Sequence, residues 1–275
     1  MANDIAVTAA MVLYNNKRPE FEKAIEAVLA CADVRQFAIV DNSERRLSSR
    51  LFGNDRVRYI HSGKNLGFGA GHNLGFSAVA DHGQFHLIIN PDISFEVGEL
   101  ERLIEFLSEN DSVSAVMPRI IYRNGDLQRL AKLLPTPYDV LVRRFSPFEC
   151  LKRKNNVRFE MHSLPLDRPT NVPCLSGCFL LFRSLAFREI GGFDPRFFMY
   201  FEDFDLVRRL RSYGDTVFFP LSVVVHGYRK GSYRNWRLLY FHISSAIRYF
   251  NKWGWFSDRD RDVVNSQAEN DLLRA

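Results

Sequence analysis

The chain has 275 residues, 46% of them hydrophobic and 25% charged, which is enough for one large domain with a sizeable core. The formal net charge of +5 is too small for a histone-like nucleic-acid binder and favours ligands that carry phosphate. No apolar run is long enough to predict a membrane-spanning helix, and the N-terminus lacks the basic region of a signal sequence. The cysteines show no zinc-type pairing and are expected to be reduced core residues of a cytoplasmic protein; they are Cys31, Cys150, Cys174 and Cys178.

Strand-like and helix-like segments alternate through the first 117 residues. The predicted strands cover residues 5–14, 36–40, 57–61, 86–89 and 113–117. Helices are predicted after Pro19, from the glycine-rich segment 63–75 towards Ala80, and around residues 100–107. This alternation predicts a three-layer α/β fold with parallel strands joined by crossover helices. Because ligands bind at the carboxyl ends of such strands, Asp41 and Asp92 are placed to contribute to a site.

Periodicity weakens between residues 118 and 171. Residues 118–158 carry ten Lys or Arg side chains against three acids, with apolar residues between them. Two interpretations remain open: a solvated insertion, or a flap that binds an acceptor or faces a membrane. Beyond it, residues 172–182 predict a strand interrupted by Ser176 and Gly177, and residues 216–219 and 223–225 predict two short strands, the second leading to His226.

Residues 226–256 contain no acid and six Lys or Arg. One helical face carries six apolar side chains: Trp236, Leu239, Tyr240, Ile243, Ile247 and Phe250. Such a helix packs on the domain or lies in a membrane interface, and the nearby Trp253, Trp255 and Phe256 suit the second possibility. The polar tail after Asp258 is expected to be loosely ordered.

Three carboxylates gather in the segment 191–210. Apolar residues at helical spacing predict a helix that begins near Asp203 and is ended by Gly214. Glu202, Asp203 and Asp205 therefore lie at its N-terminus, directly after the aromatic residues 197–201. One acid is accounted for by N-capping. Three acids behind apolar side chains predict a catalytic carboxylate.

The pattern Gly-Gly-Phe-Asp, followed by Phe-Phe-Met-Tyr-Phe-Glu-Asp-x-Asp-Leu, resembles the catalytic segment of inverting family 2 glycosyltransferases, in particular the bacterial rhamnosyltransferase-like group. The resemblance spans about residues 5–250 and implies an α/β fold of the GT-A type, a mixed and mostly parallel sheet between helices, with a C-terminal helical extension. It implies that Asp203 is the general base that deprotonates the acceptor hydroxyl. Glu202 would orient that base or bind the acceptor, and Gly177 and Asp205 would contact the acceptor.

Asn90-Pro91-Asp92 occupies the place of the family's Asp-x-Asp metal motif. Asn90 replaces the first carboxylate, a form common in the rhamnosyltransferase-like group. The resemblance implies that Asp92 and His226 hold a divalent cation, Mg²⁺ or Mn²⁺, against the donor diphosphate, with Arg229 and Lys230 neutralising the leaving group. A turn after a strand, a structural histidine and a solvated basic loop explain the same residues without any ligand.

The glycine-rich segment is neither a P-loop nor a dinucleotide fingerprint, because its spacing fits neither motif. The resemblance places it in the nucleotide-sugar pocket, where Asp41 would accept the N3–H of a pyrimidine base. The other residues expected to bind the nucleotide-sugar are Tyr14, Asn15, Asn65, Gly67, Gly69, Asn73 and Asn90.

These observations predict a catalytic domain over residues 1–228 and a basic, aromatic helical extension over 229–275. Within the domain, residues 1–117 would bind the nucleotide-sugar, 118–171 form a variable acceptor-side insertion, and 172–228 carry the catalytic acceptor half. The expected reaction moves L-rhamnose from dTDP-L-rhamnose to a lipid-linked saccharide of bacterial cell-surface polysaccharide, at the inner, anionic face of the cell membrane. A UDP-hexose donor is the alternative. A nucleotide-binding oxidoreductase and an inactive sugar-nucleotide-binding module are rivals of other classes, and no nucleic-acid partner is expected.

Overall fold

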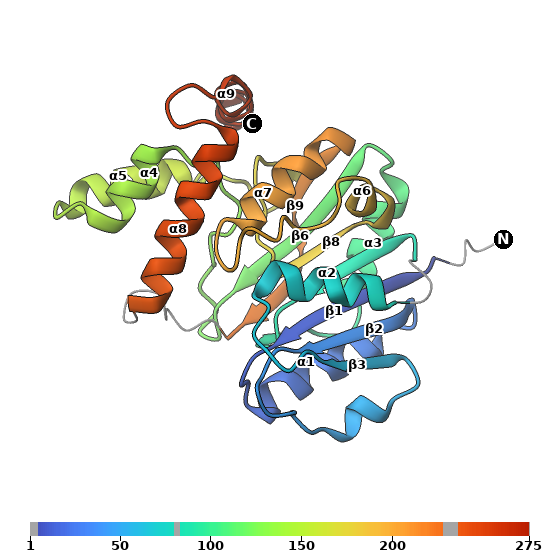
Figure 1. Cartoon of the computed structure of the whole chain (residues 1–275). Coiled ribbons are helices and arrows are strands. Elements are labelled where there is room, and N and C mark those ends of the chain that lie inside the picture. The colour runs from blue at the N-terminus through green and yellow to red at the C-terminus, as the bar shows by residue number, and fades with distance from the viewer. Residues whose placement is uncertain (1–4, 80–82, 228–235, 275) are drawn as a thin grey trace.

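A computed structural model describes residues 5–79, 83–227 and 236–274. A nine-stranded sheet runs through the molecule in the order β3-β2-β1-β4-β8-β6-β9-β5, with β7 pairing to β9 (Figure 1). The strands are β1 (Val7–Leu13), β2 (Val34–Asp41), β3 (Val57–His61), β4 (Phe85–Ile89), β5 (Ile93–Ser94), β6 (Val113–Ile121), β7 (Thr170–Asn171), β8 (Phe179–Arg183) and β9 (Asp215–His226).

The first four long strands form the parallel half predicted from the sequence. β1 lies between β2 and β4 and pairs in parallel with both. Most of β1 and all of β4 are buried, as expected for strands that are covered on both faces. Their carboxyl ends lie at one edge of the sheet, where Asp41 ends β2 and Asn90 follows β4.

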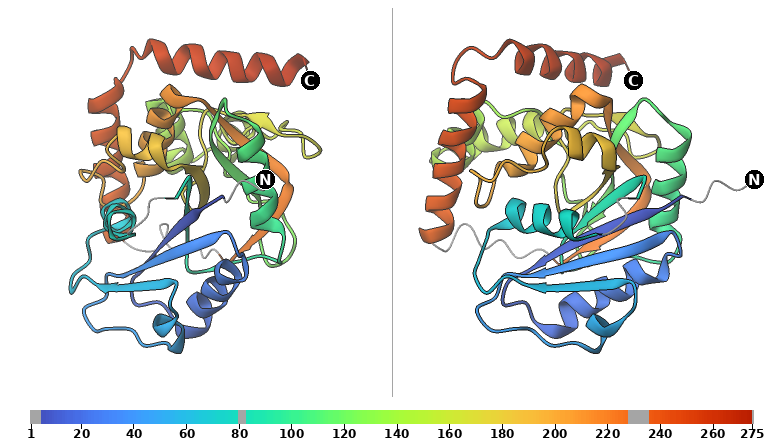
Figure 2. Two further views of the ribbon diagram at one scale, coloured as in Figure 1. Left: turned by 90° about the vertical axis from the view of Figure 1, so that its right-hand side faces the viewer. Right: turned by 45° about the vertical axis from the view of Figure 1, so that its right-hand side comes forward.

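Helices cover both faces of this sheet. α1 (Arg18–Ala30) and α3 (Glu99–Glu109) lie on one face, and α2 (Phe68–Ala78), α6 (Ser184–Glu189) and α7 (Glu202–Leu210) lie on the other (Figure 2). α1 has Pro19 in its first turn, as predicted, and buries Phe21, Ile25 and Val28. Short 3₁₀ turns complete the elements: η1 (Arg50–Gly53) and η2 (Arg211–Tyr213).

The second half of the sheet is mixed. β8 runs antiparallel to both β4 and β6, whereas β6 and β9 are parallel. The prediction of a strand over residues 172–182 was too long, because β8 begins only at Phe179. The two short strands predicted around residues 216–225 are one strand, β9, whose register shifts where Phe219 and Val223 face consecutive residues of β6. The shift absorbs Pro220, which has no N–H to donate to a regular ladder.

The insertion contains a helical hairpin that weak periodicity concealed. α4 (Pro137–Phe145) and α5 (Glu149–Phe159) pack together and project from the sheet. The sequence signal for the start of α4 is a capping box followed by a proline. Thr136 Oγ1 accepts from the Asp139 N–H, Asp139 Oδ2 accepts from the Thr136 N–H, and Pro137 lies in the first turn.

Two further helices follow the sheet, α8 (Trp236–Trp253) and α9 (Arg259–Arg274). The expectation of a loosely ordered tail is wrong for residues 259–274. Both oxygens of Asp258 accept bonds from Arg208, at 2.6 and 2.7 Å, and the Asn265 amide pairs with the backbone of Leu134. These buried polar contacts hold a helix that has little apolar surface of its own.

All four cysteines are free thiols, as predicted. Cys31, Cys174 and Cys178 are buried, and burial raises the pKa of Cys31 and Cys178 to about 12. Cys150 differs from the prediction, because it lies exposed on α5.

Candidate active site

The chain reaches the predicted catalytic helix through two residues in left-handed conformation. Tyr200 and Phe201 have φ values of 69° and 63°, which cost roughly 1–3 kcal/mol each for residues other than glycine. Phe201 is buried in a cluster with Phe197, Tyr249 and Phe250, which offsets this cost. The sharp turn begins α7 at Glu202, so that the two adjacent acids occupy its first turn.

The Asp203 carboxylate, in the first turn of α7, is surrounded by backbone N–H donors and by the positive charge of Lys132. Its Oδ1 accepts from the Phe204 N–H at 2.9 Å, and the Gly177 N–H also bonds its carboxylate. Burial raises the pKa of Asp203, and the positive charge of Lys132 together with these hydrogen bonds opposes that rise. The result is a carboxylate that is a stronger base than an ordinary aspartate while retaining donors that stabilise its ionised form.

Glu202 is buried beside it, and its Oε2 has no hydrogen-bond partner within the described residues. Burial and the neighbouring Asp203 charge raise the pKa of Glu202 well above its usual value. The pKa of both acids is therefore raised, and Asp203 is the one whose ionised form is supported by Lys132 and by backbone donors.

Asp205 differs from its predicted role. It is fully buried, its Oδ1 accepts from Lys252 at 2.6 Å and from Trp253 Nε1 at 2.9 Å, and its Oδ2 accepts from Arg209 Nε at 2.9 Å. It lines neither cavity described below. We therefore correct the predicted acceptor contact: Asp205 fastens α7 to α8.

The ends of β4 and β9 bring Asn90, Asp92 and His226 together. His226 Nε2 lies 3.2 Å from Asp92 Oδ1 and 3.5 Å from Asn90 Nδ2. On the other side of the ring, Nδ1 lies 3.0 Å from Gln128 Oε1. Gln128 Nε2 donates to the backbone carbonyls of His226 and Ile121, at 3.1 and 3.5 Å, which turns Oε1 towards the ring. This arrangement favours the Nδ1–H tautomer of His226, with the Nε2 lone pair directed towards Asp92.

This donor set suits a divalent cation that shares its coordination with a ligand. No group of three or more His, Cys, Asp or Glu side chains within the described ranges is placed to hold a metal. Asp92 and His226 supply two donors, one anionic and one neutral, and a lone pair facing a carboxylate at 3.2 Å is repulsive unless a cation or proton lies between them. Mg²⁺ and Mn²⁺ commonly take few protein ligands and complete their shell with phosphate and water.

A cavity of about 790 Å³ connects these two groups of residues. Its lining includes Asp203, Glu202 and Gly177 from the acid site and Asn90, His226 and Gln128 from the ends of β4 and β9 and their surroundings. A smaller cavity of about 260 Å³ adjoins it and shares the same two acids. The predicted base and the predicted metal ligand His226 thus lie in one space, although 23 residues separate them in the chain.

The glycine-rich segment contacts protein where a nucleotide was expected. A Cβ at Gly67 would lie 2.3 Å from the Phe198 carbonyl, and one at Gly69 would lie 2.8 Å from Phe193. The Asn73 side chain donates to the Phe193 carbonyl and accepts from the Phe193 N–H, both at 2.8 Å. These two hydrogen bonds connect α2 to the acid segment. Gly67 and Gly69 thus allow the segment before α7 to approach closely, and the expected contact with a nucleotide-sugar stays a prediction. Asn65 closes its own turn by accepting from the Gly67 N–H.

The remaining residues predicted to contact the nucleotide-sugar lie at the carboxyl ends of β1 and β2. Asp41 is fully buried, and its oxygens accept from Ser43 N–H, Leu47 N–H and Tyr59 O–H at 2.6–3.0 Å. Burial raises its pKa, but these donors outweigh burial and lower it overall. Every oxygen of Asp41 is thus engaged by protein, which differs from the predicted direct bond to a base. Tyr14 is half exposed and Asn15 has a φ of 53°, both just after β1, and their predicted contact with the nucleotide-sugar stays a prediction. Arg229 and Lys230 lie outside the described residues.

The sequence analysis missed several cavity residues, and Gln128 and Lys132 are two of them. Both lie in the insertion, where no periodicity marked a strand or helix. Gln128 is placed by the backbone bond from its N–H to the Ile120 carbonyl, and Lys132 by the bond from its N–H to the Cys174 carbonyl. These are long-range contacts that a local pattern does not encode.

Comparison with known proteins assigns this chain to a family. Residues 8–191 match the family described as Glycosyl transferase family 2, which is more than half of the chain. The chain belongs to glycosyl transferase family 2. The matched range ends before Glu202, so the acid segment lies beyond it.

Several curated members of the family are similar to this chain. It is 31% identical over 185 residues to N-acetylglucosaminyl-diphospho-decaprenol L-rhamnosyltransferase of Mycobacterium tuberculosis, covering 62% of this chain and 58% of that protein. It is 27% identical over 214 residues to the low-salt glycan biosynthesis hexosyltransferase Agl10 of Haloferax volcanii, covering 77% and 62%. It is 25% identical over 258 residues to rhamnosyltransferase WbbL of Escherichia coli, covering 89% and 93%. The chain thus spans about three fifths of the length of the first two relatives.

Solved structures confirm the predicted GT-A-type fold. The mannosyltransferase PcManGT from Pyrobaculum calidifontis, in complex with GDP-Man and Mn²⁺, aligns with a TM-score of 0.60 at 17% identity, covering 100% of this chain and 71% of that one. GalNAc-T7 with UDP, GalNAc and Mn²⁺ aligns with a TM-score of 0.59 at 15% identity, covering 82% and 44%. Within the described ranges of this family 2 chain, no helix has the length and apolar character needed to cross a bilayer.

Proposed function

We propose that this protein is an inverting glycosyltransferase that moves L-rhamnose from dTDP-L-rhamnose to a lipid-linked saccharide of cell-surface polysaccharide. One observation supports the proposal: a single cavity is lined by Asp203 and also by Asn90 and His226. A base and a diphosphate site that share one space are what a direct displacement needs. On this proposal residues 1–228 are the catalytic domain and 229–275 its extension.

Asp203 removes the proton from an acceptor hydroxyl as the hydroxyl oxygen attacks the anomeric carbon. The bond between that carbon and the diphosphate oxygen breaks, and the configuration inverts. Glu202, held protonated, donates a hydrogen bond to a neutral acceptor oxygen and adds no second negative charge. Gly177 N–H keeps the Asp203 carboxylate aligned.

Asp92 and His226 would hold a Mg²⁺ or Mn²⁺ ion, which supplies positive charge to the departing diphosphate when bound. Gln128 holds the His226 ring in the orientation this requires. Asn90 would contribute its amide oxygen to the same shell after a rotation of its side chain, since Nδ2 now faces His226.

The donor sugar is the finer part of this proposal. Two of the similar proteins are named as rhamnosyltransferases, which supports rhamnose. The hexosyltransferase Agl10 supports the alternative of a UDP-hexose. The oxidoreductase rival is weakened because Gly67 and Gly69 pack against Phe198 and Phe193 of the acid segment, which accounts for these two glycines without a dinucleotide. The intact acid pair weighs against an inactive module.

Peripheral contact with an anionic membrane would bring the enzyme to a lipid-linked acceptor. α8 packs on the domain through Ala246, Tyr249 and Phe250 and presents its other face outward, where Trp236 and Tyr240 are 74% and 63% exposed. The predicted apolar face of this helix is therefore divided. Phe250 packs inward, whereas its solvent-exposed members are aromatic and aliphatic side chains beside Arg237 and Arg248. That combination suits a headgroup layer.

Calorimetric titration of dTDP-rhamnose, UDP-glucose, UDP-galactose and NAD, each with and without Mn²⁺, tests the proposal. Binding of one sugar nucleotide that Mn²⁺ strengthens, followed by transfer to a lipid-linked saccharide with inverted configuration, is the expected result. Binding of NAD alone would overturn it.

A further inference from the structure

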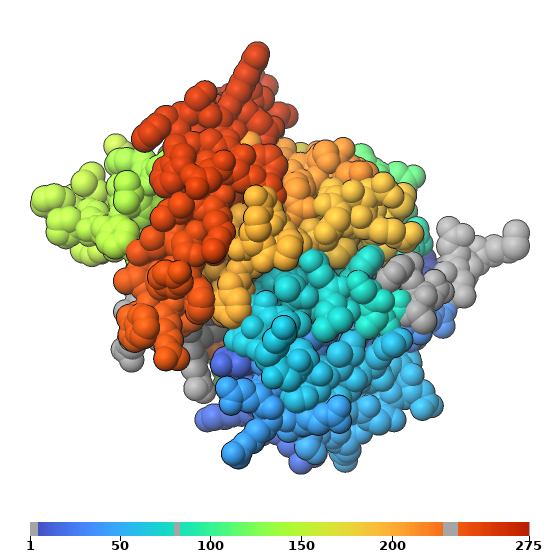
Figure 3. Space-filling view, in the orientation of Figure 1, coloured from blue at the N-terminus to red at the C-terminus, as the bar shows by residue number. Residues whose placement is uncertain are grey.

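The α4–α5 hairpin of the insertion projects from the body of the molecule beside α8 (Figure 3). Its inner side is held in place by specific contacts. Val140 packs against the cluster that contains Tyr249 and Phe250 of α8, and the Arg143 guanidinium donates to Glu160 at 2.8 Å. The hairpin is therefore a fixed part of the structure, and its outer side is presented in a defined orientation.

The outer side of this hairpin is apolar. Tyr138, Leu141 and Phe145 are 55–60% exposed, and their spacing of three and four residues places them on one face of α4. Phe148 follows in the turn and Leu151 in the first turn of α5, and both are also exposed. None of these five side chains, which we call the hairpin face, packs against a hydrophobic cluster of the described chain. Single exposed apolar residues are ordinary, but a group of neighbours marks an interaction surface.

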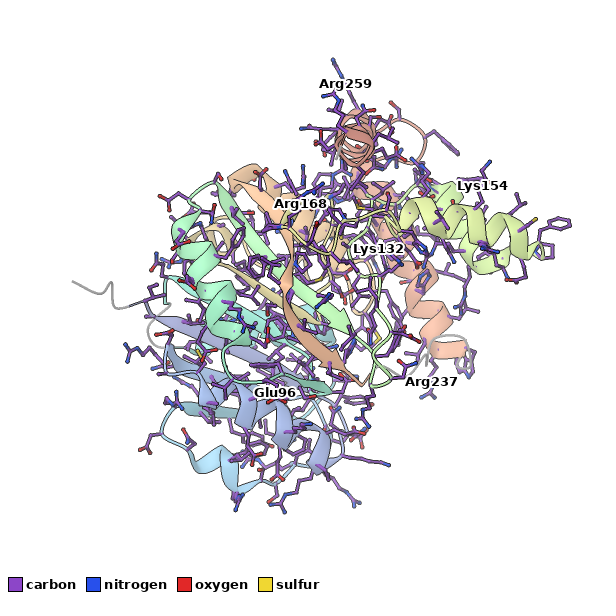
Figure 4. All side chains as sticks on the ribbon, turned by 180° about the vertical axis from the view of Figure 1, so that it is seen from behind. Glu96, Lys132, Lys154, Arg168, Arg237 and Arg259 are labelled. Carbon is purple, nitrogen blue, oxygen red and sulfur yellow. The ribbon has the colours of Figure 1, made fainter. Side chains whose placement is uncertain are left out.

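Positive charge accompanies the hairpin face. Residues 137–159 contain six Lys or Arg side chains against two acids. Three of these cations have an acid partner at 2.8 Å: Arg143 with Glu160, Lys152 with Glu149, and Arg158 with Glu269. Arg153 and Lys154 are exposed on α5 and make no hydrogen bond or ion pair with any other part of the described chain. Figure 4 shows Lys154 on the hairpin, away from the body of the molecule.

We propose that the hairpin face enters the headgroup layer of an anionic bilayer, with Arg153 and Lys154 at the lipid phosphates. The inference rests on the membrane contact of the proposed function and adds a second surface to it, separate from the outer face of α8. Aromatic and aliphatic side chains beside basic ones suit this layer, because the apolar groups leave water while the cations stay among the phosphates. The helices have nine and eleven residues, about half of the length that spans a bilayer, so the contact is interfacial.

The charge favours a bilayer over a second copy of this chain. Two copies that docked through the same surface would bring Arg153 and Lys154 of one chain against the same residues of the other. Like charges held together in this way oppose association, whereas an anionic lipid surface attracts both cations.

The two proposed membrane surfaces flank the site of the proposed base. α4 and α8 both line the smaller cavity, through Val140 and His242, and Asp203 lines it as well. A bilayer in contact with both helices would hold a lipid-linked acceptor beside this cavity. Two contacts on one body bind a surface more tightly than either does alone, so loss of either should release the protein.

Cys150 provides a reporter next to the hairpin tip, because it is exposed and the other three cysteines are buried. The full chain is labelled there with an environment-sensitive fluorophore and mixed with vesicles, without donor or acceptor. We expect the emission to shift to shorter wavelength with vesicles of phosphatidylglycerol and phosphatidylcholine in equal parts, and to stay unchanged with phosphatidylcholine alone. Cys150→Ser, which should take up no label, checks that the signal comes from this position.

Two double variants test the hairpin face and its charge separately. Phe145→Glu with Phe148→Glu should weaken vesicle binding at least about tenfold, because two large side chains no longer leave water. Arg153→Gln with Lys154→Gln should weaken it about 30-fold at low salt, because each cation at an anionic surface contributes roughly fivefold. Val97→Glu with Leu185→Glu changes two exposed apolar residues elsewhere and should alter binding less than about twofold. Circular dichroism and thermal melting check that each variant is folded.

An emission from labelled Cys150 that does not respond to anionic vesicles would overturn the inference, even if the chain floats with them through α8. A shift that appears on raising the protein concentration without lipid would also overturn it, in favour of a protein partner. Failure of the proposed function is distinguishable. It would appear as the absence of sugar-nucleotide binding in calorimetry without vesicles, a measurement that the hairpin variants should leave unchanged.

Discussion

The Asp205 carboxylate lies 2.6 Å from the Lys252 ammonium, and this contact joins the helix that carries the proposed base to the C-terminal helix. Asp205 is three positions from Glu202 in the same helix, yet it points into the protein and not into either cavity. Adjacent acids in one short segment therefore have different tasks, set by the face of α7 on which each lies.

Replacing Asp205 with Asn should lower stability and leave acceptor affinity unchanged. The substitution leaves Lys252 and Arg209 without their shared anion, which should cost about 3–5 kcal/mol of unfolding free energy. Urea denaturation measures the loss. Asp271→Asn, at an exposed position of α9, is the control. A raised acceptor KM with unchanged stability would return Asp205 to its predicted role.

Replacing Asp203 with Asn should reduce transfer by about 100- to 10,000-fold while sugar-nucleotide binding persists. The base must be ionised to accept a proton, so kcat should fall as pH decreases through the raised pKa of Asp203. Lys132→Met should move this acidic limb to higher pH, because the positive charge of Lys132 lowers that pKa. A limb that stays in place in Lys132→Met would contradict the electrostatic coupling, and retained turnover in Asp203→Asn would exclude Asp203 as the base.

Replacing Gln128 with Leu should weaken the binding of Mn²⁺ to the enzyme. The substitution removes the hydrogen-bond acceptor that orients the His226 ring. Loss of such a partner typically lowers metal affinity about 10- to 100-fold. Calorimetric titration with Mn²⁺ in the presence of donor measures the change. Donor binding without metal should be unaffected, which separates this effect from misfolding.

His72 should make the protein sensitive to acid. Its ring is fully buried on α2, both nitrogens lack hydrogen-bond partners within the described structure, and burial lowers its pKa to about 3. In the unfolded chain it protonates near pH 6.5, so between pH 6.5 and 3 the unfolded state binds the extra proton. Its contribution to stability is therefore complete above pH 6.5 and falls by about 1.4 kcal/mol per unit as pH decreases.

His72→Leu should flatten this dependence in denaturation curves measured from pH 7 to pH 4.5. Ser77→Ala, on the exposed side of the same helix, should leave the slope as it is in the unmodified chain. An unchanged slope in His72→Leu would show that other groups cause the acid sensitivity.

Acidic substitutions on the outer face of α8 should abolish membrane contact. Tyr240→Glu combined with Ile243→Glu places charge where the proposed surface meets anionic lipid, and flotation with vesicles that contain phosphatidylglycerol measures the loss. Leu273→Glu, on the exposed side of α9, is the control. Flotation that is equal for the unmodified chain and the double variant would leave this face without a lipid partner.

The local sequence determined the parallel half of the sheet, the start of α7 and the presence of acids behind an aromatic segment. Alternating strand and helix patterns, and turns at Asp41 and Asn90, are encoded within a few residues, and so were predictable. The glycine-rich segment was expected to line a nucleotide-sugar pocket, and the neighbours of Gly67 and Gly69 are residues of the protein itself.

The tertiary structure determined what those residues contact. Gly67 approaches the Phe198 backbone, Asn73 holds Phe193, and Asp205 meets Lys252 across 47 positions of sequence. The placement of Gln128 and Lys132 at the cavity also depends on contacts with residues far along the chain. Packing free energy and long-range hydrogen bonds choose the partner of each side chain, and a pattern of neighbouring residues contains no record of that choice.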